Sequence, residues 1–226
     1  NIGIVLPQAG YLQGVRELTR RHGSLLVNDE THTLSAGPGG CTLAWGLEPD
    51  LVTVGKAIAG GIAAGAYGVS AAVADRVAAR RDADLVDTGG VGGTLAGNAL
   101  SVAAMRATLE HVLTDQAFEH MIGLATRFCD GVRGVIDVCG VRWSVVQLGA
   151  RAEYRFCRPA PVNGGQSAAA GDEELEDYLH LYLHNRGILL TPFHNMALMC
   201  PATTAADVDR HTEVFGAAVA ELVGAG

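Results

Sequence analysis

The first half of the chain alternates between stretches with helical and with strand-like hydrophobic spacing. Apolar residues recur every three or four positions over residues 11–21, which predicts a helix that ends before Gly23. Short apolar runs predict three strands, at residues 24–28, 51–54 and 66–70. Because we expect these strands to be joined through helices, the pattern predicts a mostly parallel sheet with covered faces.

The second half changes to longer helices and fewer strands. A helix is predicted over residues 98–112, and Thr114 or Asp115 is expected to cap the next one. That next helix carries one apolar stripe, formed by Phe118, Ile122, Ala125, Cys129, Val132 and Ile136. The remaining expected elements are strands at 143–148, 152–157 and 188–191, a loop at 159–171, and helices at 172–186 and 205–222. We therefore expect a first domain at 1–113 and a small α+β domain at 114–226.

Composition narrows the classes of function. The net charge is −8 and no basic stripe is present, so we expect no binding to nucleic acid, which requires phosphate neutralisation. The five cysteines are odd in number and form no C-x-x-C pair, so we expect neither a disulfide framework nor a zinc site. A reducing, cytoplasmic location is the corresponding expectation.

One long uncharged stretch requires a choice between a membrane span and a loop. Residues 57–74 carry no charge, but they are mostly Gly and Ala with few large apolar side chains. We therefore expect no membrane span here, and predict a glycine-rich loop that enters a buried strand.

Two charged residues stand where a ligand site is expected in an open α/β sheet. Asp29 follows the first predicted strand, and Lys56 follows the second and is the only lysine in the chain. Pyridoxal phosphate needs a lysine amine for its Schiff base and an acid that keeps its pyridine nitrogen protonated. Spacing alone is a weak signal, because most Asp/Lys pairs at strand ends are ordinary loop charges.

Three motifs resemble the class III pyridoxal-phosphate aminotransferases, specifically the branch of glutamate-1-semialdehyde aminomutase and the β-amino-acid transaminases. They are NDETHT at 28–33, PDLVTVGKAIAGG at 49–61 and GTLAGN at 93–98. The similarity extends over nearly the whole chain, as far as residues 185–195. It implies an α/β fold of fold-type I, with part of the large domain's mostly parallel sheet followed by a small C-terminal α+β domain.

The resemblance also implies roles for individual residues. Lys56 matches the catalytic Schiff-base lysine, and Asp29 matches the carboxylate under the pyridine nitrogen. Thr31 and His32 fall where the family has residues that meet the face and the hydroxyl of the cofactor ring, although both differ from the commonest residues there. Thr94 matches a residue that reaches the phosphate of the neighbouring subunit, which implies a homodimer with shared active sites.

An amino-acid substrate requires a cation for its carboxylate, and arginine binds carboxylates through two parallel hydrogen bonds. Arg186 resembles the carboxylate-binding arginine of the β-amino-acid branch, but it is also explained as a cation at a helix C-terminus. Arg155 is the second candidate. His180 and His184 lie four residues apart, yet Leu181 replaces the acid of a zinc-protease motif, so we expect no metal.

These features predict a pyridoxal-phosphate-dependent aminotransferase that moves an amino group from an amino acid, possibly a β-amino acid, to an oxo acid. The family's N-terminal half has no counterpart in the chain, so the missing part belongs to a longer protein, to a separate chain, or is truly lost. Two alternatives therefore stay open. One is an aminomutase of the glutamate-1-semialdehyde type, and the other is a non-catalytic half that acts only as an assembly subunit.

Overall fold

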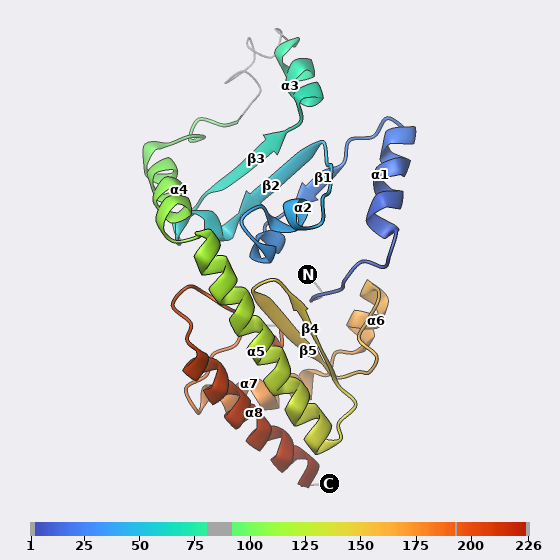
Figure 1. Ribbon diagram of the computed structural model, residues 1–226, viewed down its shortest axis with the longest axis vertical. Coiled ribbons are helices and arrows are strands. Elements are labelled where there is room, and N and C mark those ends of the chain that lie inside the picture. The colour runs from blue at the N-terminus through green and yellow to red at the C-terminus, as the bar shows by residue number, and fades with distance from the viewer. Residues whose placement is uncertain (1–2, 81–91, 193, 225–226) are drawn as a thin grey trace. The chain divides into compact units, whose positions relative to one another are not determined.

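The computed structural model describes residues 3–80, 92–192 and 194–224, and these residues form two compact units. The N-terminal unit consists of residues 10–34 and 38–114, and the C-terminal unit consists of residues 3–9, 35–37 and 115–224. Each unit has one three-stranded sheet (Figure 1). A compact unit need not fold independently, so the division into domains at 1–113 and 114–226 stays a prediction.

The N-terminal unit contains α1 (Tyr11–Arg21), β1 (Val27–Asp29), α2 (Gly40–Ala44), β2 (Leu51–Gly55), η2 (Lys56–Ala59), β3 (Gly65–Val69), α3 (Ala71–Ala78) and α4 (Ala99–His111). The predicted helix at 11–21 is confirmed, and the predicted helix at 98–112 is confirmed with Asn98 as its N-cap. The 3₁₀ turn η1 (Thr33–Ala36) follows β1. The first strand is shorter than predicted, because it begins at Val27.

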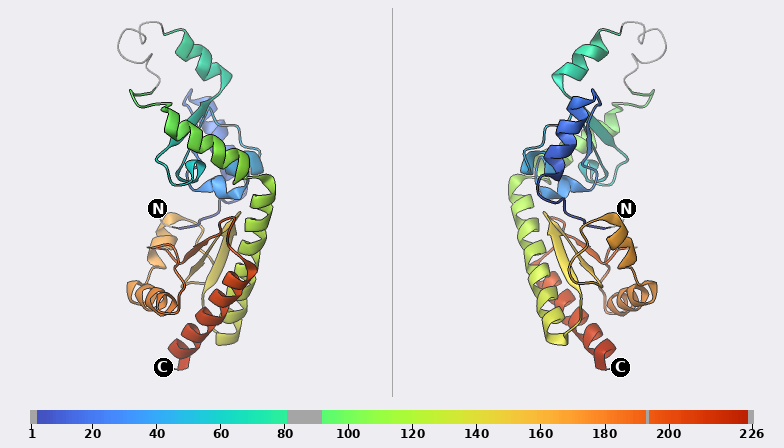
Figure 2. Two further views of the ribbon diagram at one scale, coloured as in Figure 1. Left: turned by 90° about the vertical axis from the view of Figure 1, so that its left-hand side faces the viewer. Right: turned by 90° about the vertical axis from the view of Figure 1, so that its right-hand side faces the viewer.

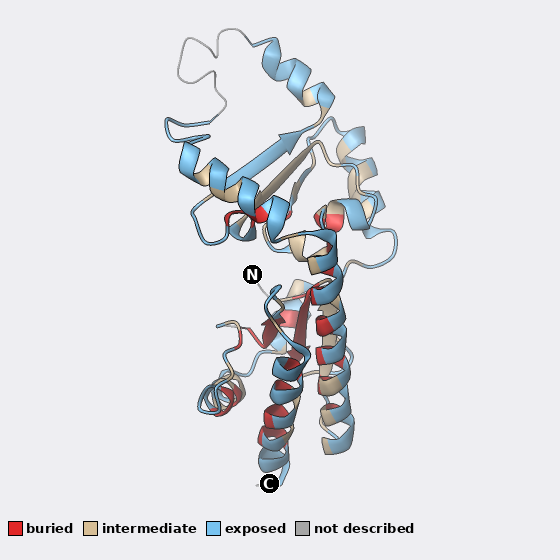
Figure 3. Cartoon of the chain, turned by 60° about the vertical axis from the view of Figure 1, so that its left-hand side comes forward, coloured by how far each residue is buried: buried red, intermediate tan, exposed pale blue. Residues whose placement is uncertain are grey.

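The sheet of the N-terminal unit corrects two expectations. β1 pairs with β2 in parallel, but β2 pairs with β3 in antiparallel, because only η2 and a short glycine-rich loop separate them. All five residues of β3 are exposed, whereas we expected a buried strand. Residues of this unit are predominantly exposed in Figure 3, so the chain itself covers little of this sheet.

An ion pair connects α1 to the start of β2. The Arg16 guanidinium donates two hydrogen bonds to the Asp50 carboxylate, at 2.7 and 3.1 Å. Asp50 also accepts the backbone N–H of Leu26 at 2.8 Å. The hydrogen bond from Arg16 lowers the pKa of Asp50 to about 2, so this carboxylate stays charged. It thereby connects α1 to the residues directly before β1 and β2.

Glu30 anchors the loop that leaves β1. Its buried carboxylate accepts hydrogen bonds from the Cys41 and Thr42 amides and from the Thr33 and Thr42 hydroxyls. Gly40 has φ +60°, and a Cβ there would overlap the carboxylate. A buried carboxylate surrounded by donors is held in a single position, so Glu30 fixes the loop on either side of it.

The C-terminal unit contains α5 (Asp115–Cys139), β4 (Ser144–Leu148), β5 (Arg151–Arg155), α6 (Gly164–Ala169), α7 (Glu173–His184), β6 (Met196–Leu198) and α8 (Ala205–Gly224). The predicted loop at 159–171 is wrong in part, because the Asn163 side chain accepts the Gln166 amide and caps α6. The predicted strand at 188–191 is also wrong. The third strand is β6, which pairs with β5, while Leu190 packs its side chain into the core.

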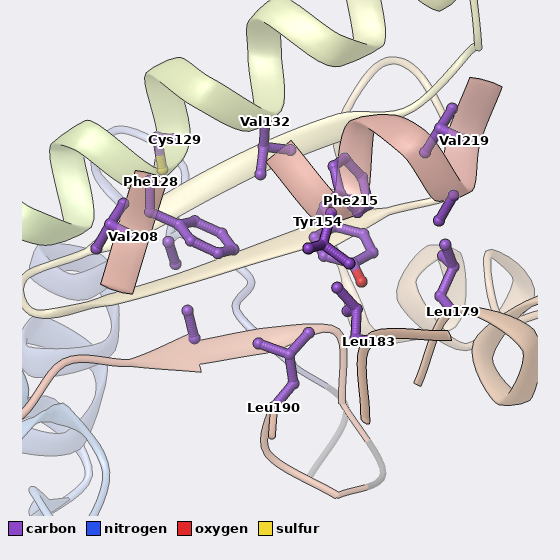
Figure 4. Close-up of a cluster of buried hydrophobic side chains, with 14 of the residues drawn as sticks. Phe128, Cys129, Val132, Tyr154, Leu179, Leu183, Leu190, Val208, Phe215 and Val219 are labelled. Atoms are coloured by element: carbon purple, nitrogen blue, oxygen red, sulfur yellow. The ribbon is translucent and has the colours of Figure 1, made fainter. Parts of the chain in front are cut away.

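The core of the C-terminal unit lies between its sheet and its helices. Helices α5 and α8 run side by side in both views of Figure 2. Phe128 and Val132 from α5 meet Tyr154 from β5 and Phe215 from α8 in Figure 4. Five of the six residues predicted for the α5 stripe are buried, and Ile122 is half-buried, so the 3.6-residue period identified this face.

The opposite face of β5 is polar. Because side chains alternate along a strand, Ala152 and Tyr154 point into the core while Glu153 and Arg155 point away from it. Glu153 is 1% exposed; it accepts the Ile4 amide at 2.5 Å and lies 3.4 Å from His194 Nδ1. Arg155 donates to Ser167 Oγ at 2.8 Å. This buried cluster ties the chain segment around Ile4 to the sheet.

No helix among the described residues is long and apolar enough to cross a membrane.

We predict that His211 makes the stability of the C-terminal unit depend on pH. Its ring stacks on Phe215, neither ring nitrogen has a hydrogen-bond partner within the described part of the chain, and burial lowers its pKa from 6.5 to about 4. The folded pKa lies below the unfolded one, so stability is full above about pH 6.5 and is lost as pH falls through about 4.

Replacement by His211→Leu is expected to abolish this loss, which amounts to up to about 3 kcal/mol. Urea unfolding followed by Trp143 fluorescence between these pH values measures it. His184→Leu, at an exposed position on α7, is the matched control and should leave the pH dependence as it is. An identical pH profile in wild type and His211→Leu would contradict the prediction.

A second prediction concerns Glu30. Glu30→Ala leaves the buried amides of the Cys41–Thr42 turn without an acceptor, which is expected to lower the free energy of unfolding of the N-terminal unit by about 2 kcal/mol or more. Hydrogen exchange at these two amides reports the change directly. Glu48→Ala removes a carboxylate that pairs with Arg20 on the exposed surface, and should cost less than about 0.5 kcal/mol.

Candidate functional site

Asp29 and Lys56 lie at the same edge of the N-terminal sheet. Asp29 is the last residue of β1 and faces Thr53 of β2 in the parallel register. The Glu30 amide donates to the Thr53 carbonyl at 2.8 Å, so the ladder continues until the chain turns away. Lys56 follows β2 directly. Since parallel strands end at one edge, the predicted placement of both residues at carboxyl strand ends is confirmed, with Asp29 as the last residue of its strand and Lys56 directly after its own.

Lys56 has an unusual backbone conformation. Its φ is +52°, and among the described residues it is the only non-glycine residue with a positive φ. An L-residue in this left-handed region costs about 1–2 kcal/mol, and such residues concentrate at functional sites. Gly55 before it is extended, and the 3₁₀ turn η2 begins at Lys56 itself. The strain therefore falls on the residue whose side chain carries the amine.

The Lys56 amine is held by a histidine from the neighbouring loop. Lys56 Nζ lies 3.0 Å from His32 Nε2, which is hydrogen-bond distance. In its protonated form His32 also acts on Asp29, because the imidazolium charge is one of the influences that lower the pKa of that carboxyl. His32 therefore links the two residues that the sequence singled out. Its predicted contact with a cofactor hydroxyl stays a prediction.

The hydrogen bonds around Asp29 favour its ionised form. Hydrogen bonds from the Thr31 hydroxyl and from the Thr31 amide, the latter at 2.9 Å, lower its pKa. A carboxylate stabilised in this way suits a partner that must stay cationic, such as a protonated pyridine nitrogen. Thr31 thus acts on Asp29, while its expected packing against a ring face stays a prediction.

Asp29, His32 and Lys56 are exposed side chains on an open surface. A cavity of about 240 Å³ occurs elsewhere in the same unit, against α1, and is lined by residues such as Leu12, Arg16 and Glu48. Its lining includes neither Asp29 nor Lys56, so this cavity is separate from the residues at the sheet edge.

Glu30 is the residue that the sequence reasoning missed. It touches neither Lys56 nor Asp29 through a hydrogen bond of its carboxylate, but it holds the loop in which Asp29, Thr31 and His32 occur. The signal was an acidic residue directly beside the functional aspartate in NDETHT. Which of two adjacent acids turns inward depends on the register of β1, and the sequence pattern did not define that register.

Thr94 lies in an exposed turn just before α4. The Asn98 side chain caps α4 by accepting the Ser101 amide at 3.0 Å, and the Ser101 hydroxyl donates to the Ala63 carbonyl at 3.0 Å. This last bond ties the start of α4 to the loop between η2 and β3. The turn with Thr94 is thereby attached to the chain that leaves Lys56, and the role of Thr94 in phosphate binding stays a prediction.

The two arginine candidates have different environments, both within the C-terminal unit. Arg155 is buried, lies 3.8 Å from Glu153 and donates to Ser167, so it has an internal structural role. Arg186 is exposed at the end of α7, where it donates to the Tyr182 carbonyl at 3.2 Å and stacks on the Tyr182 ring at 3.5 Å. Binding of a substrate carboxylate by Arg186 stays a prediction.

Among the described residues, no group of three or more His, Cys, Asp or Glu side chains is arranged to hold a metal ion.

Comparison with known proteins gives a consistent family. The family model described as Aminotransferase class-III matches residues 1–219. A glutamate-1-semialdehyde 2,1-aminomutase of Anaeromyxobacter sp. (strain Fw109-5) is 33% identical over 224 residues, which are 98% of this chain and 50% of the relative. The chain therefore spans about half the length of the curated relatives it matches.

Solved structures give the same result. A crystal structure of a glutamate-1-semialdehyde-aminomutase from Pseudomonas aeruginosa PAO1 is 50% identical with a TM-score of 0.93, over 98% of this chain and 50% of that one. A second crystal structure of that enzyme, a variant, is in complex with PMP. A β-phenylalanine aminotransferase from Variovorax paradoxus is 27% identical with a TM-score of 0.82, over 99% of this chain and 50% of that one. With a family model matched along nearly its entire length, this chain belongs to the class-III aminotransferase family.

Proposed function

We propose that this chain provides the lysine-bearing half of an active site for pyridoxal-phosphate-dependent amino transfer. The observation that carries the proposal is the linked group at the sheet edge, in which the strained Lys56 places its amine 3.0 Å from His32 beside the ionised Asp29. Family membership supports the same chemistry, and PMP, the amine form of this cofactor, is present in a structure 49% identical to the chain.

The residues of the site suit this cofactor. When bound, pyridoxal phosphate supplies a reactive aldehyde and a cationic ring that accepts electrons from the substrate's Cα. Asp29 would hold the proton on the ring nitrogen, since hydrogen bonds from Thr31 favour its charged form. Thr31 and His32 would lie against the ring and its hydroxyl. Thr94 and the glycine-rich backbone before α4 would take the phosphate, as in other anion sites at helix starts.

Lys56 has two tasks in the proposal. Its amine would hold the cofactor through the cofactor's aldehyde. Once free, the same amine would take and return a proton at the substrate's Cα. Both tasks require the same nitrogen to stay near one place. The short tether after β2 and the contact with His32 provide that constraint.

The substrates that we propose are an amino acid as donor and an oxo acid as acceptor. Arg186 is the proposed partner of the donor's carboxylate, because its planar guanidinium is exposed and its stacking on Tyr182 holds it in a defined plane. The similarity to the β-phenylalanine aminotransferase from Variovorax paradoxus supports a β-amino acid as one donor class.

An aminomutase is the second candidate, and the names of several relatives favour it, including one solved structure at 50% identity. The two activities differ in whether the amine leaves the molecule that brought it. Incubation with a panel of amino donors and either 2-oxoglutarate or pyruvate separates them. A transaminase forms a new oxo acid and a new amino acid, whereas an aminomutase isomerises glutamate-1-semialdehyde without net exchange.

We also propose that the site is completed by protein beyond the described residues, in a homodimer with shared active sites. The Lys56 site is open, and α4 exposes large apolar side chains at Leu100, Val102 and Leu109. Exposed apolar groups of this size mark surfaces that another protein segment covers. A non-catalytic assembly subunit is the alternative, and a cytoplasmic location remains part of the proposal.

The first prediction from this function concerns Lys56. Protein purified from its own cells under native conditions, saturated with pyridoxal phosphate and treated with borohydride, should carry a pyridoxyl group on the Lys56 peptide in mass spectrometry. Lys56→Ala should carry none there and lose at least about a thousandfold in kcat. Lys56→Arg keeps the charge but cannot condense, and should behave alike. No modification of Lys56 in the wild-type protein would favour the assembly subunit.

The second prediction concerns Asp29. Asp29→Asn cannot hold the proton on the ring nitrogen, so kcat/KM is expected to fall about a hundredfold or more, while covalent capture at Lys56 persists. Steady-state kinetics and the borohydride assay together measure both effects. Asp75→Asn, on the exposed surface of α3, is the control and should leave both unchanged. Full activity in Asp29→Asn would remove Asp29 from the site.

A further inference from the structure

We propose that His32 is the positioning residue for the Lys56 amine, holding it by a hydrogen bond at the sheet edge before any cofactor arrives. This inference rests on the proposed function, because it assigns a partner to the nitrogen on which that function depends. Two separate features of the chain carry it. One is the contact between Lys56 Nζ and His32 Nε2 at 3.0 Å, and the other is the left-handed backbone of Lys56.

The contact has a defined direction. A lysine ammonium has three donors and no acceptor, so the imidazole Nε2 is the acceptor whenever Lys56 is charged. The proton of the neutral ring then resides on Nδ1. The hydrogen bond therefore uses the neutral form of the His32 ring, and it restrains the end of the Lys56 side chain.

The backbone conformation explains why such a partner is needed. A lysine side chain has four rotatable bonds, and an exposed one samples many rotamers. The φ of +52° fixes where the side chain leaves the main chain, but not where its end lies. The hydrogen bond to His32 restricts the end. His32 in turn belongs to the loop that Glu30 holds, so the restraint on the amine originates in a buried carboxylate.

The test uses the fact that Lys56 is the only lysine among the 226 residues. Native protein is freed of cofactor by hydroxylamine and dialysis, and the rate at which a small acylating reagent modifies Lys56 is measured by peptide mass spectrometry over neutral and mildly alkaline pH. The amine must leave its hydrogen bond before it can attack the reagent, so a hydrogen bond to His32 slows the reaction. Activity does not enter this measurement.

Two substitutions of similar size separate hydrogen bonding from shielding. In His32→Leu the acceptor is lost, and acylation should become about fivefold faster, the equivalent of about 1 kcal/mol for one net hydrogen bond. In His32→Gln the carboxamide oxygen replaces the acceptor, and the rate should remain within about twofold of the wild type. His22→Ala, an exposed histidine that ends α1 in the same unit, should leave the rate unchanged.

A wild-type rate in His32→Leu overturns the inference, and so does a rate in His32→Gln as high as in His32→Leu. The borohydride capture of pyridoxal phosphate at Lys56 is run beside it on the wild-type protein. Failure of that capture rejects the proposed function while the acylation rates still decide the role of His32. A successful capture with unchanged acylation rates rejects the role of His32 alone.

Discussion

The parallel pairing of β1 with β2 is the constraint on which the site depends. It places Asp29 opposite Thr53 and makes both strands end at one edge. The loop that carries Thr31 and His32 then leaves beside the turn that carries Lys56, and the lysine amine meets the imidazole at 3.0 Å. A shift of one residue in this pairing would turn every side chain of the strand to the opposite face. Asp29 would then no longer point outward.

Two adjacent acidic residues, Asp29 and Glu30, have different roles at this edge of the sheet. Glu30 turns inward, where four donors from Thr33, Cys41 and Thr42 satisfy its carboxylate, and it makes the loop rigid. Asp29 turns outward, where Thr31 keeps it ionised without burying it. Burial of Asp29 without such partners would be costly. Exposure of Glu30 would leave the loop without an anchor. The chemistry of Asp29 therefore depends on the packing of its neighbour.

The two units differ in how much of their own surface they bury. The C-terminal unit has a closed apolar core in which Phe128, Tyr154 and Phe215 interlock. On its polar strand face, Glu153 and Arg155 are buried beside charged or polar partners. The N-terminal unit leaves all of β3 exposed and has large apolar side chains at its surface. A sheet of the α/β type normally has both faces covered. This difference agrees with a chain that spans about half the length of its relatives.

Local signals in the sequence determined the helices. The 3.6-residue apolar period defines the helices, and the capping residues Asn98 and Asp172 mark where α4 and α7 begin. The apolar stripe of α5 packs into the core of its unit. The motifs around Asp29 and Lys56 indicated the family, which the family model over residues 1–219 confirms. These features depend on neighbours within a few positions, so they can be read from the order of residues alone.

Strand partners and side-chain contacts depended on tertiary structure. An apolar run at 188–191 looks like a strand in isolation, yet β5 pairs with β6 instead, and β3 runs antiparallel although its composition is that of any short strand. Arg155 is indistinguishable by sequence from a surface arginine, but Glu153 and Ser167 surround it. The contact of His32 with Lys56, 24 positions away, follows only from the register of two strands, because pairing across a sheet is not encoded within either strand.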